Sequence, residues 1–154
     1  MQIFKPKFWS KKNSLISYSL LPFSLFFQLF LILKKNLSKE EKFSIPVICV
    51  GNIYVGGTGK TPLAIEIVKI LKKINIKSAI VKKSYKQHND EFRLIKSKKI
   101  ALLKSSSRAT AIKEAEINKF DCAVLDDGYQ DFSINKNLNI LCFNEKQLIG
   151  NGMV

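Results

Sequence analysis

A stretch without charged residues lies between Lys12 and Lys34, and leucine, isoleucine and phenylalanine dominate it. Its length reaches the roughly 20 residues that a helix needs to cross the hydrocarbon core of a bilayer. We therefore expect an apolar helix over residues 13–33, within an N-terminal membrane-associating segment of residues 1–42.

Four interpretations of this helix stay open. Pro22 and several serines are unusual for a plain spanning helix, and lysines on both flanks give no orientation under the positive-inside rule. A helix lying in the interface, with its flanking lysines on anionic headgroups, fits about as well. A cleaved signal peptide lacks a small-residue cleavage site here, and a buried core helix would be less uniformly apolar. The pattern favours membrane contact without deciding between crossing the bilayer and lying on it.

Beyond residue 43, short apolar runs alternate with amphipathic ones. The apolar runs predict buried strands, and the periodic stretch after Lys60 predicts a helix with one apolar face. Ser107, or a neighbouring serine, is expected to cap a helix that reaches Lys119. This alternation predicts an α/β domain over residues 43–154, with a parallel sheet flanked by helices. The expected strands are residues 45–50, 77–81, 100–103, 120–125 and 138–143.

Composition narrows the class of partner but does not identify it. With 154 residues and a hydrophobic share of 46%, the chain can form one domain with a core. The formal charge of +14 favours an anionic partner, such as a nucleotide, a nucleic acid or a lipid headgroup layer. The three cysteines are isolated in apolar runs, and lone His88 has no second histidine or cysteine nearby, so neither a disulfide framework nor a zinc site is expected.

The run Gly56-Gly57-Thr58-Gly59-Lys60-Thr61 joins an expected strand to an expected helix, which is the context of a Walker A phosphate-binding loop. Glycines allow backbone N–H groups to turn toward phosphate oxygens, while Lys60 reaches the outer phosphates. Thr61 would offer its hydroxyl to Mg²⁺. Tyr54 replaces the loop's usual first glycine, and the alternative is a simple glycine-rich turn. The order of elements favours a P-loop NTPase-like fold that binds a nucleoside triphosphate and Mg²⁺.

A second signal is the run "CAVLDDGYQD" at residues 122–131. An apolar strand that ends in Asp126 and Asp127 places carboxylates at the carboxyl edge of a parallel sheet, where ligands bind. A Walker B aspartate completes magnesium coordination from this position. Asp-Asp-Gly is also good turn chemistry, which is the alternative. Following a Walker A loop, the run favours a metal-site role for Asp126.

Together, "VGNIYVGGTGKTP", "DDGYQD" and "LIGNGMV" resemble the tetraacyldisaccharide 4'-kinases, the lipid A 4'-kinases of Gram-negative bacteria. The resemblance covers nearly the whole chain, and that family also has a non-glycine residue at the Tyr54 position. It implies ATP-dependent phosphorylation of the 4'-hydroxyl of a tetraacylated glucosamine disaccharide, a lipid A precursor. It also implies a site at the cytoplasmic face of the bacterial inner membrane, with the apolar segment bringing the enzyme to its acylated substrate.

The resemblance implies roles for individual residues. Lys60 matches the phosphate-binding lysine, Thr61 and Asp126 match the magnesium-site residues, and Asp127 matches the second acid of that pair. Asp90 lies in "HNDEFRLI", where the family has a Gly-Asp-Glu-Pro run whose aspartate is implicated as the base for the sugar hydroxyl. A helix N-terminal acid is the alternative for Asp90.

The resemblance also implies substrate contacts for Tyr85, Glu91, Arg108 and Asp127. For Glu91 and Arg108 the alternative is a solvated charge on a helix.

Several departures from the family pattern weaken the substrate contacts more than the ATP contacts. Residues 82–86, Lys-Lys-Ser-Tyr-Lys, stand where the family has Ser-Arg-Gly-Tyr-Gly, and Asp131 stands where the family has histidine. The chain stops at "GNGMV", where the family continues into a second α/β portion that carries a histidine partner of the base. The resemblance therefore implies an N-terminal fragment that is weak or inactive as a kinase.

Two other functions are compatible with parts of the sequence. A membrane-tethered P-loop nucleotide switch without lipid kinase activity would hydrolyse nucleotide in response to a protein partner. A nucleic-acid binder is suggested only by charge, and the dispersed lysines and lack of a recognition module place it last. We expect no nucleic-acid partner, and the sequence does not indicate an oligomeric state.

Overall fold

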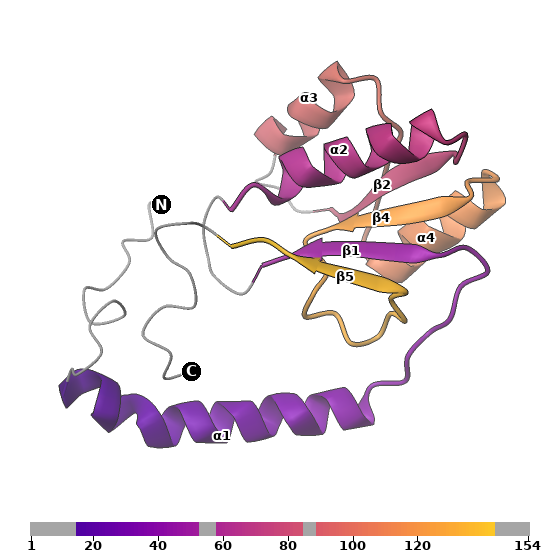
Figure 1. Cartoon of the computed structure of the whole chain (residues 1–154). Coiled ribbons are helices and arrows are strands. Elements are labelled where there is room, and N and C mark those ends of the chain that lie inside the picture. The colour runs from indigo at the N-terminus through magenta and orange to yellow at the C-terminus, as the bar shows by residue number, and fades with distance from the viewer. Residues whose placement is uncertain (1–14, 53–57, 85–88, 144–154) are drawn as a thin grey trace. The chain divides into compact units, whose positions relative to one another are not determined.

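A computed structural model describes residues 15–52, 58–84 and 89–143 of the chain (Figure 1). The chain divides into two units, which we describe separately: the described part of the first is essentially one helix, and the second comprises residues 39–142. The elements, in chain order, are α1 (Leu15–Leu37), β1 (Val47–Gly51), α2 (Lys60–Lys73), β2 (Ser78–Lys83), α3 (Asn89–Ser97), β3 (Leu102–Ser105), α4 (Arg108–Ile117), β4 (Cys122–Asp126) and β5 (Leu138–Leu141).

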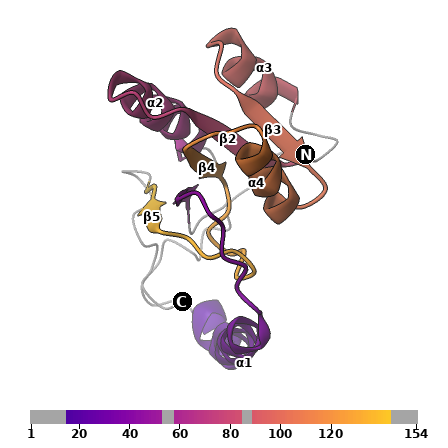
Figure 2. The same cartoon turned by 90° about the vertical axis from the view of Figure 1, so that its right-hand side faces the viewer.

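The second unit is built on a five-stranded parallel sheet with the strand order β3-β2-β4-β1-β5. Helices α2 and α3 cover one face of the sheet and α4 covers the other (Figure 2). The predicted α/β fold with a parallel, helix-flanked sheet is therefore confirmed. Because the strands are parallel, their carboxyl ends meet at one edge, which is where ligands of open α/β sheets bind.

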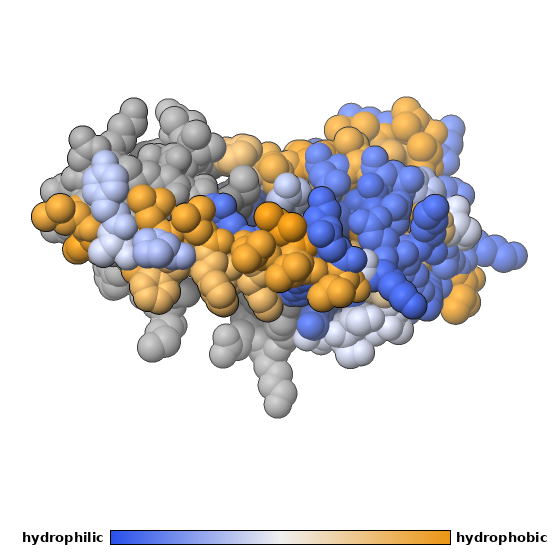
Figure 3. Space-filling model, turned by 90° about the horizontal axis from the view of Figure 1, so that it is seen from below, coloured by the Kyte–Doolittle hydropathy of each residue, from blue (hydrophilic) through white to orange (hydrophobic). Residues whose placement is uncertain are grey.

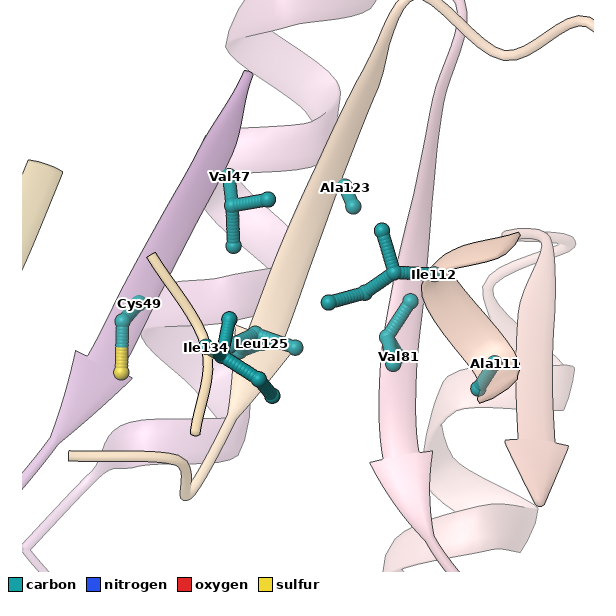
Figure 4. Close-up of a cluster of buried hydrophobic side chains, with 8 residues drawn as sticks. All are labelled: Val47, Cys49, Val81, Ala111, Ile112, Ala123, Leu125 and Ile134. Carbon is teal, nitrogen blue, oxygen red and sulfur yellow. The ribbon is translucent and has the colours of Figure 1, made fainter. Parts of the chain in front are cut away.

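Two apolar clusters pack on the two faces of the sheet. Alternate residues of a strand point to opposite faces, so neighbours such as Val124 and Leu125 enter different clusters. The α4-side cluster is drawn in Figure 4 and contains Val47, Cys49, Val81, Ala111, Ile112, Ala123, Leu125 and Ile134. The α2-side cluster contains Val50, Ala64, Ile65, Val68, Ile80, Ile95 and Val124.

The predicted strands are all present, with ends that differ by one or two residues. β1 begins at Val47 rather than at residue 45, and β2 begins at Ser78 but continues to Lys83, beyond the predicted end at residue 81. β5 ends at Leu141 instead of residue 143. Apolar runs include the first residues of the flanking loops. The apolar pattern therefore locates a strand more reliably than it locates the strand's first and last residues.

Helix starts follow local chemistry. Ser107 caps α4, because its side chain accepts a hydrogen bond of 3.0 Å from the Thr110 backbone N–H, as predicted. α4 ends at Ile117, two residues before the predicted end. The residue before α2 is Gly59, in the left-handed region with φ of 80°, a conformation that glycine adopts without a Cβ penalty. The chain therefore turns sharply into α2 at the phosphate-loop sequence.

Burial suppresses the ionisation of the cysteine thiols. Cys49 in β1 and Cys122 in β4 are buried and free, and Cys142 follows β5 and is half-buried. Desolvation raises the pKa of all three thiols, and that of Cys122 to about 11. Among the described residues these cysteines act as small apolar core residues, as their sequence context predicts.

Large apolar side chains line the face of helix α1 that Figure 3 shows, and its sequence places apolar residues on its other faces as well. Residues at many angular positions of the helix are large and apolar, including Phe23, Leu25, Phe26 and Phe27. A helix of this kind is typical of a membrane-contacting or fully buried segment. By length and composition alone, its window Tyr18–Leu37 could cross a bilayer, a test that signal sequences and core helices also satisfy.

Candidate nucleotide-binding site

The carboxyl ends of β1, β4 and β2 lie side by side, and α2 begins at the same edge of the sheet. Val50 of β1 pairs with Asp126 at the end of β4, and Val81 of β2 pairs with Leu125 one residue earlier. α2 starts at Lys60, so its unpaired backbone N–H groups lie at this edge. The start of a helix favours anions through these donors and its partial positive charge.

Asp126 is the most deeply buried polar residue of this edge, at 1% exposure. The Thr61 hydroxyl donates a hydrogen bond of 2.7 Å to Asp126 Oδ2. Lys82 Nζ lies 2.8 Å from the same oxygen, and the Lys82 and Asp126 side chains are 8% and 0% exposed. The other oxygen, Asp126 Oδ1, is buried and has no hydrogen-bond partner among the described residues.

The sheet geometry explains why these three side chains meet. Lys82 and Asp126 each follow the paired residues Val81 and Leu125, so they occupy adjacent positions on neighbouring strands. In register, they point to the same face as Ile80 and Val124, which is the face covered by α2. Thr61 is in the first turn of that helix. Two strands and one helix start therefore converge on a single carboxylate.

The second acid of the run makes a looser contact. Lys60 Nζ lies 3.7 Å from Asp127 Oδ1, and the Asp127 side chain is 58% exposed. Asp127 has a positive φ of 68°, a conformation that aspartate and asparagine adopt more readily than most residues. Its backbone N–H donates to Val50 O at 2.9 Å, which anchors the turn to β1. A solvent-exposed pair at this distance contributes at most about 1 kcal/mol.

Arg108 holds the other side of the turn. This first residue of α4 is 3.2 Å from Asp131 Oδ2 through Nη1, and its Nη2 donates to the Asp127 carbonyl. Burial raises the Asp131 pKa, but hydrogen bonds from Ser133 and Arg108 together with the Arg108 charge outweigh it, so the net pKa is below the usual range. Arg108 is thus tied to the backbone of the Asp-Asp-Gly turn.

Gly51 allows the turn to lie against β1. A Cβ added at Gly51 would stand 2.5 Å from the Tyr129 Cβ, closer than real Cβ contacts allow. The Gly51 carbonyl also accepts a hydrogen bond of 2.8 Å from the Cys142 N–H, which follows β5. The last residue of β1 and the turn after β4 therefore lie in direct contact.

The structure brings together part of the predicted site. Thr58, Gly59, Lys60, Thr61, Asp126 and Asp127 lie along one edge of the sheet, and Arg108 contacts the turn beside them. Gly56, Gly57 and Tyr85 lie outside the described residues. Asp90 and Glu91 belong to the first turn of α3, and their side chains are outside the description. Their predicted roles stay predictions.

The residues fit a magnesium ion held with a nucleotide. Mg²⁺ usually takes one or two protein oxygens and completes its shell with phosphates and water. Thr61 offers a hydroxyl, and Asp126 offers a carboxylate whose buried Oδ1 has no partner among the described residues. Among the described residues, no group of three or more histidine, cysteine, aspartate or glutamate side chains is placed to hold a metal ion, so we expect metal binding without phosphates to be weak.

Comparisons with known proteins identify the family of this chain. A family model described as tetraacyldisaccharide-1-P 4'-kinase matches residues 16–103, more than half of the chain. The chain belongs to this family. The match runs from α1 through β3 and includes the Gly59–Thr61 loop. The resemblance inferred from the sequence is thereby confirmed.

Relatives of the family cover nearly all of this chain. A tetraacyldisaccharide 4'-kinase of Pelagibacter ubique is 47% identical over 99% of this chain and 48% of its own length. One of Rickettsia canadensis is 32% identical over 100% of this chain and 52% of its own length. The chain therefore spans about half the length of the curated relatives it matches.

A solved family structure shares the fold. A crystal structure of LpxK from Aquifex aeolicus in complex with ATP has a TM-score of 0.70 and 26% sequence identity. The alignment covers 86% of this chain and 50% of that one. The P-loop kinase fold of the family is thus confirmed for the part of the chain that the alignment covers.

Sequence reasoning missed two residues of the site. Lys82 was noted only as part of a run that departs from the family pattern, and Asp131 only as a substitution for histidine. A lysine at the end of an apolar strand is a usable signal, because buried lysines are rare unless they are paired. Finding its partner would have required the strand order.

Proposed function

We propose that this chain provides the nucleotide-binding part of an ATP-dependent kinase that phosphorylates the 4'-hydroxyl of a tetraacylated glucosamine disaccharide in lipid A biosynthesis. The observation that carries the proposal is the buried Thr61–Asp126 hydrogen bond at the start of α2, next to Lys60. Family membership supports the acceptor, and the ATP complex of the Aquifex aeolicus protein supports the donor.

In this proposal the chain's residues position the triphosphate. The backbone N–H groups at the start of α2 bind phosphate oxygens, and Gly59 leaves room for them because, among the described residues beyond its chain neighbours, no atom lies within 4 Å of an added Cβ. Lys60 leaves its exposed contact with Asp127 and binds the outer phosphates. Thr61 and Asp126 would hold Mg²⁺, which supplies charge neutralisation on the transferred phosphoryl group.

We further propose Asp90 as the base that accepts the proton of the sugar hydroxyl. Asp90 is the second residue of α3, which begins six residues after the end of β2. Six residues of chain span no more than about 20 Å, so α3 starts within reach of the carboxyl edge of the sheet. Proton acceptance by a positioned carboxylate contributes typically 10²- to 10⁴-fold to a rate.

Two of the proposed substrate contacts, Asp127 and Arg108, lie at this edge. Asp127 is exposed, so it can meet a ligand once Lys60 has moved to the phosphates. Arg108 is 13% exposed at its side chain and already binds Asp131, so a contact with substrate would be made from a fixed guanidinium. Tyr85 and Glu91 complete the proposed set.

We propose that α1 associates with the cytoplasmic face of the bacterial inner membrane. A helix with apolar side chains on all sides gains most by burying them in acyl chains. Lys34 and Lys35 in its last turn suit anionic headgroups. The acyl chains of the substrate would then be delivered from the same bilayer.

Labelled ATP and the lipid disaccharide acceptor test the proposal. The 154-residue chain is compared with a fusion in which the second half of the Pelagibacter ubique relative follows Val154. We expect label on the lipid with the fusion and its loss in the same fusion carrying Lys60→Ala. Nucleotide hydrolysis without labelled lipid would contradict the kinase proposal and favour a nucleotide switch.

A further inference from the structure

Lys82 is a buried ionic group of the site that the proposed phosphate-loop chemistry does not use. It lies in β2, two strands away from β1, and its side chain is 8% exposed. Lysines are almost never this buried unless a partner compensates the charge. The partner here is Asp126, the carboxylate proposed for magnesium.

We propose that Lys82 is a positioning residue of the nucleotide site: its ammonium holds the Asp126 carboxylate in place as a built-in counter-ion, and a divalent cation must compete with it. This inference rests on the proposed role of Asp126 at the metal site. It extends that role by naming Lys82 as the residue that pairs with the Asp126 carboxylate before metal and nucleotide bind.

The contacts support the competition. Lys82 Nζ and the Thr61 hydroxyl both bind Oδ2, at 2.8 Å and 2.7 Å, so one oxygen receives two donors. The other oxygen, Oδ1, is buried without a partner among the described residues. A cation that approaches Asp126 therefore comes within a few ångströms of the ammonium, at a depth where repulsion is weakly screened.

The arrangement also fixes the geometry of the carboxylate. Two donors on one oxygen, from β2 and from α2, restrict both the position and the rotation of the Asp126 side chain. Without Lys82, Asp126 would be a buried charge with a single hydroxyl donor. Removing one partner of a buried pair costs far more than removing both, because it leaves the other charge uncompensated.

A stability cycle in EDTA tests the counter-ion role on the whole chain in detergent. The variants are Lys82→Met, Asp126→Asn, the double variant, and Lys72→Met as an exposed control lysine. We expect Lys82→Met to lower Tm by roughly 10 °C, Lys72→Met by about 2 °C or less, and the double variant to be more stable than either single variant.

If Lys82→Met does not fold, comparing the stability of Asp126→Asn with that of the double variant still tests the counter-ion role of Lys82. A double variant that is no more stable than Asp126→Asn would overturn the counter-ion role. Because this arm contains neither metal nor nucleotide, its result is independent of kinase activity.

Metal affinity tests the competition, which a purely structural lysine would not affect. Free Mn²⁺ is followed by electron paramagnetic resonance during titration of the chain without nucleotide. We expect Lys82→Met to bind Mn²⁺ about tenfold more tightly than the unchanged chain, and Lys82→Arg, which keeps the charge, to bind like the unchanged chain.

Equal or weaker Mn²⁺ binding by Lys82→Met would overturn the proposal, even with the expected stability cycle. If only the kinase proposal is wrong, no labelled lipid forms, while the stability cycle and the Mn²⁺ titration still give the expected results. The two failures are therefore distinguishable.

Discussion

Asp126 and Asp127 are neighbours in the sequence, yet the two sides of the site that they serve differ sharply. On the buried side, Asp126 is 0% exposed at its side chain and binds both Lys82 and Thr61. On the exposed side, Asp127 is 58% exposed and lies 3.7 Å from Lys60. The buried side is suited to fix a metal ligand, whereas the exposed side can release its lysine to a phosphate at little cost.

The largest expected effect is the loss of ATP affinity when Lys60 is replaced. Lys60→Ala should weaken ATP binding by about 100-fold, because a charge-assisted contact with phosphate is worth roughly 1.5–3 kcal/mol. Its stability should change by less than about 1 kcal/mol, since its pair with Asp127 is exposed. Equilibrium dialysis with labelled ATP and urea unfolding measure the two quantities. A large loss of stability in Lys60→Ala would contradict the difference between the exposed and the buried side of the site.

The turn that carries both aspartates should be sensitive at Gly51. Gly51→Ala places a methyl group 2.5 Å from the Tyr129 Cβ, so the turn must move, at an expected cost of about 2 kcal/mol. Gly59→Ala is the control: its Cβ meets no atom of the described residues within 4 Å apart from its chain neighbours, so the strain of φ 80° is the expected cost, about 1 kcal/mol. Urea unfolding measures the stability of both variants. A larger stability loss for Gly59→Ala than for Gly51→Ala would contradict the close packing of Gly51 against Tyr129.

An intermediate, pH-dependent effect is expected at Asp131. Its pKa lies below the usual range in the folded protein, so its contribution to stability is present at neutral pH and lost as the pH falls through the folded pKa. Asp131→Asn should therefore cost about 1 kcal/mol at pH 7, with a gap that closes in acid. Urea unfolding at pH 7 and pH 3 checks this. A gap that stays constant would mean that the carboxylate charge is irrelevant.

The smallest effect is expected at Asp127. Asp127→Asn should change stability by less than about 0.5 kcal/mol, because an exposed pair is screened by water and salt. ATP affinity should stay the same or rise a few-fold, since Lys60 loses a competing carboxylate. Dialysis at low and high salt measures this. A loss of affinity comparable to that of Lys60→Ala would place Asp127 on the ligand.

Local pattern predicted much of the fold. Val47–Val50 and Val124 are apolar because they are buried in a parallel sheet, and the stripe of α2 reports its packing on that sheet. Helix α3 was not predicted as an element in its own right, and a helix start at Asp90 was only the alternative to its implied role. It is short, and polar residues fill much of it, so tertiary packing through Ile95 decides its place.

The site was predicted where its residues are contiguous and missed where they are distant. Gly59–Thr61 and Asp126–Asp127 are local runs whose chemistry is visible in the sequence. The Lys82–Asp126 pair depends on β2 lying beside β4, and no local pattern specifies that order. The ties of Arg108 to the turn likewise join residues that α4 and β4 bring together.

Calorimetric titration of ATP into the purified chain, with and without Mg²⁺, probes the site most directly. We expect saturable binding at one site that strengthens when Mg²⁺ is present, and a loss of this metal effect in Asp126→Ala. Absence of any binding heat in Mg²⁺, or a metal effect that survives Asp126→Ala, would contradict the assignment of this edge of the sheet to a magnesium nucleotide.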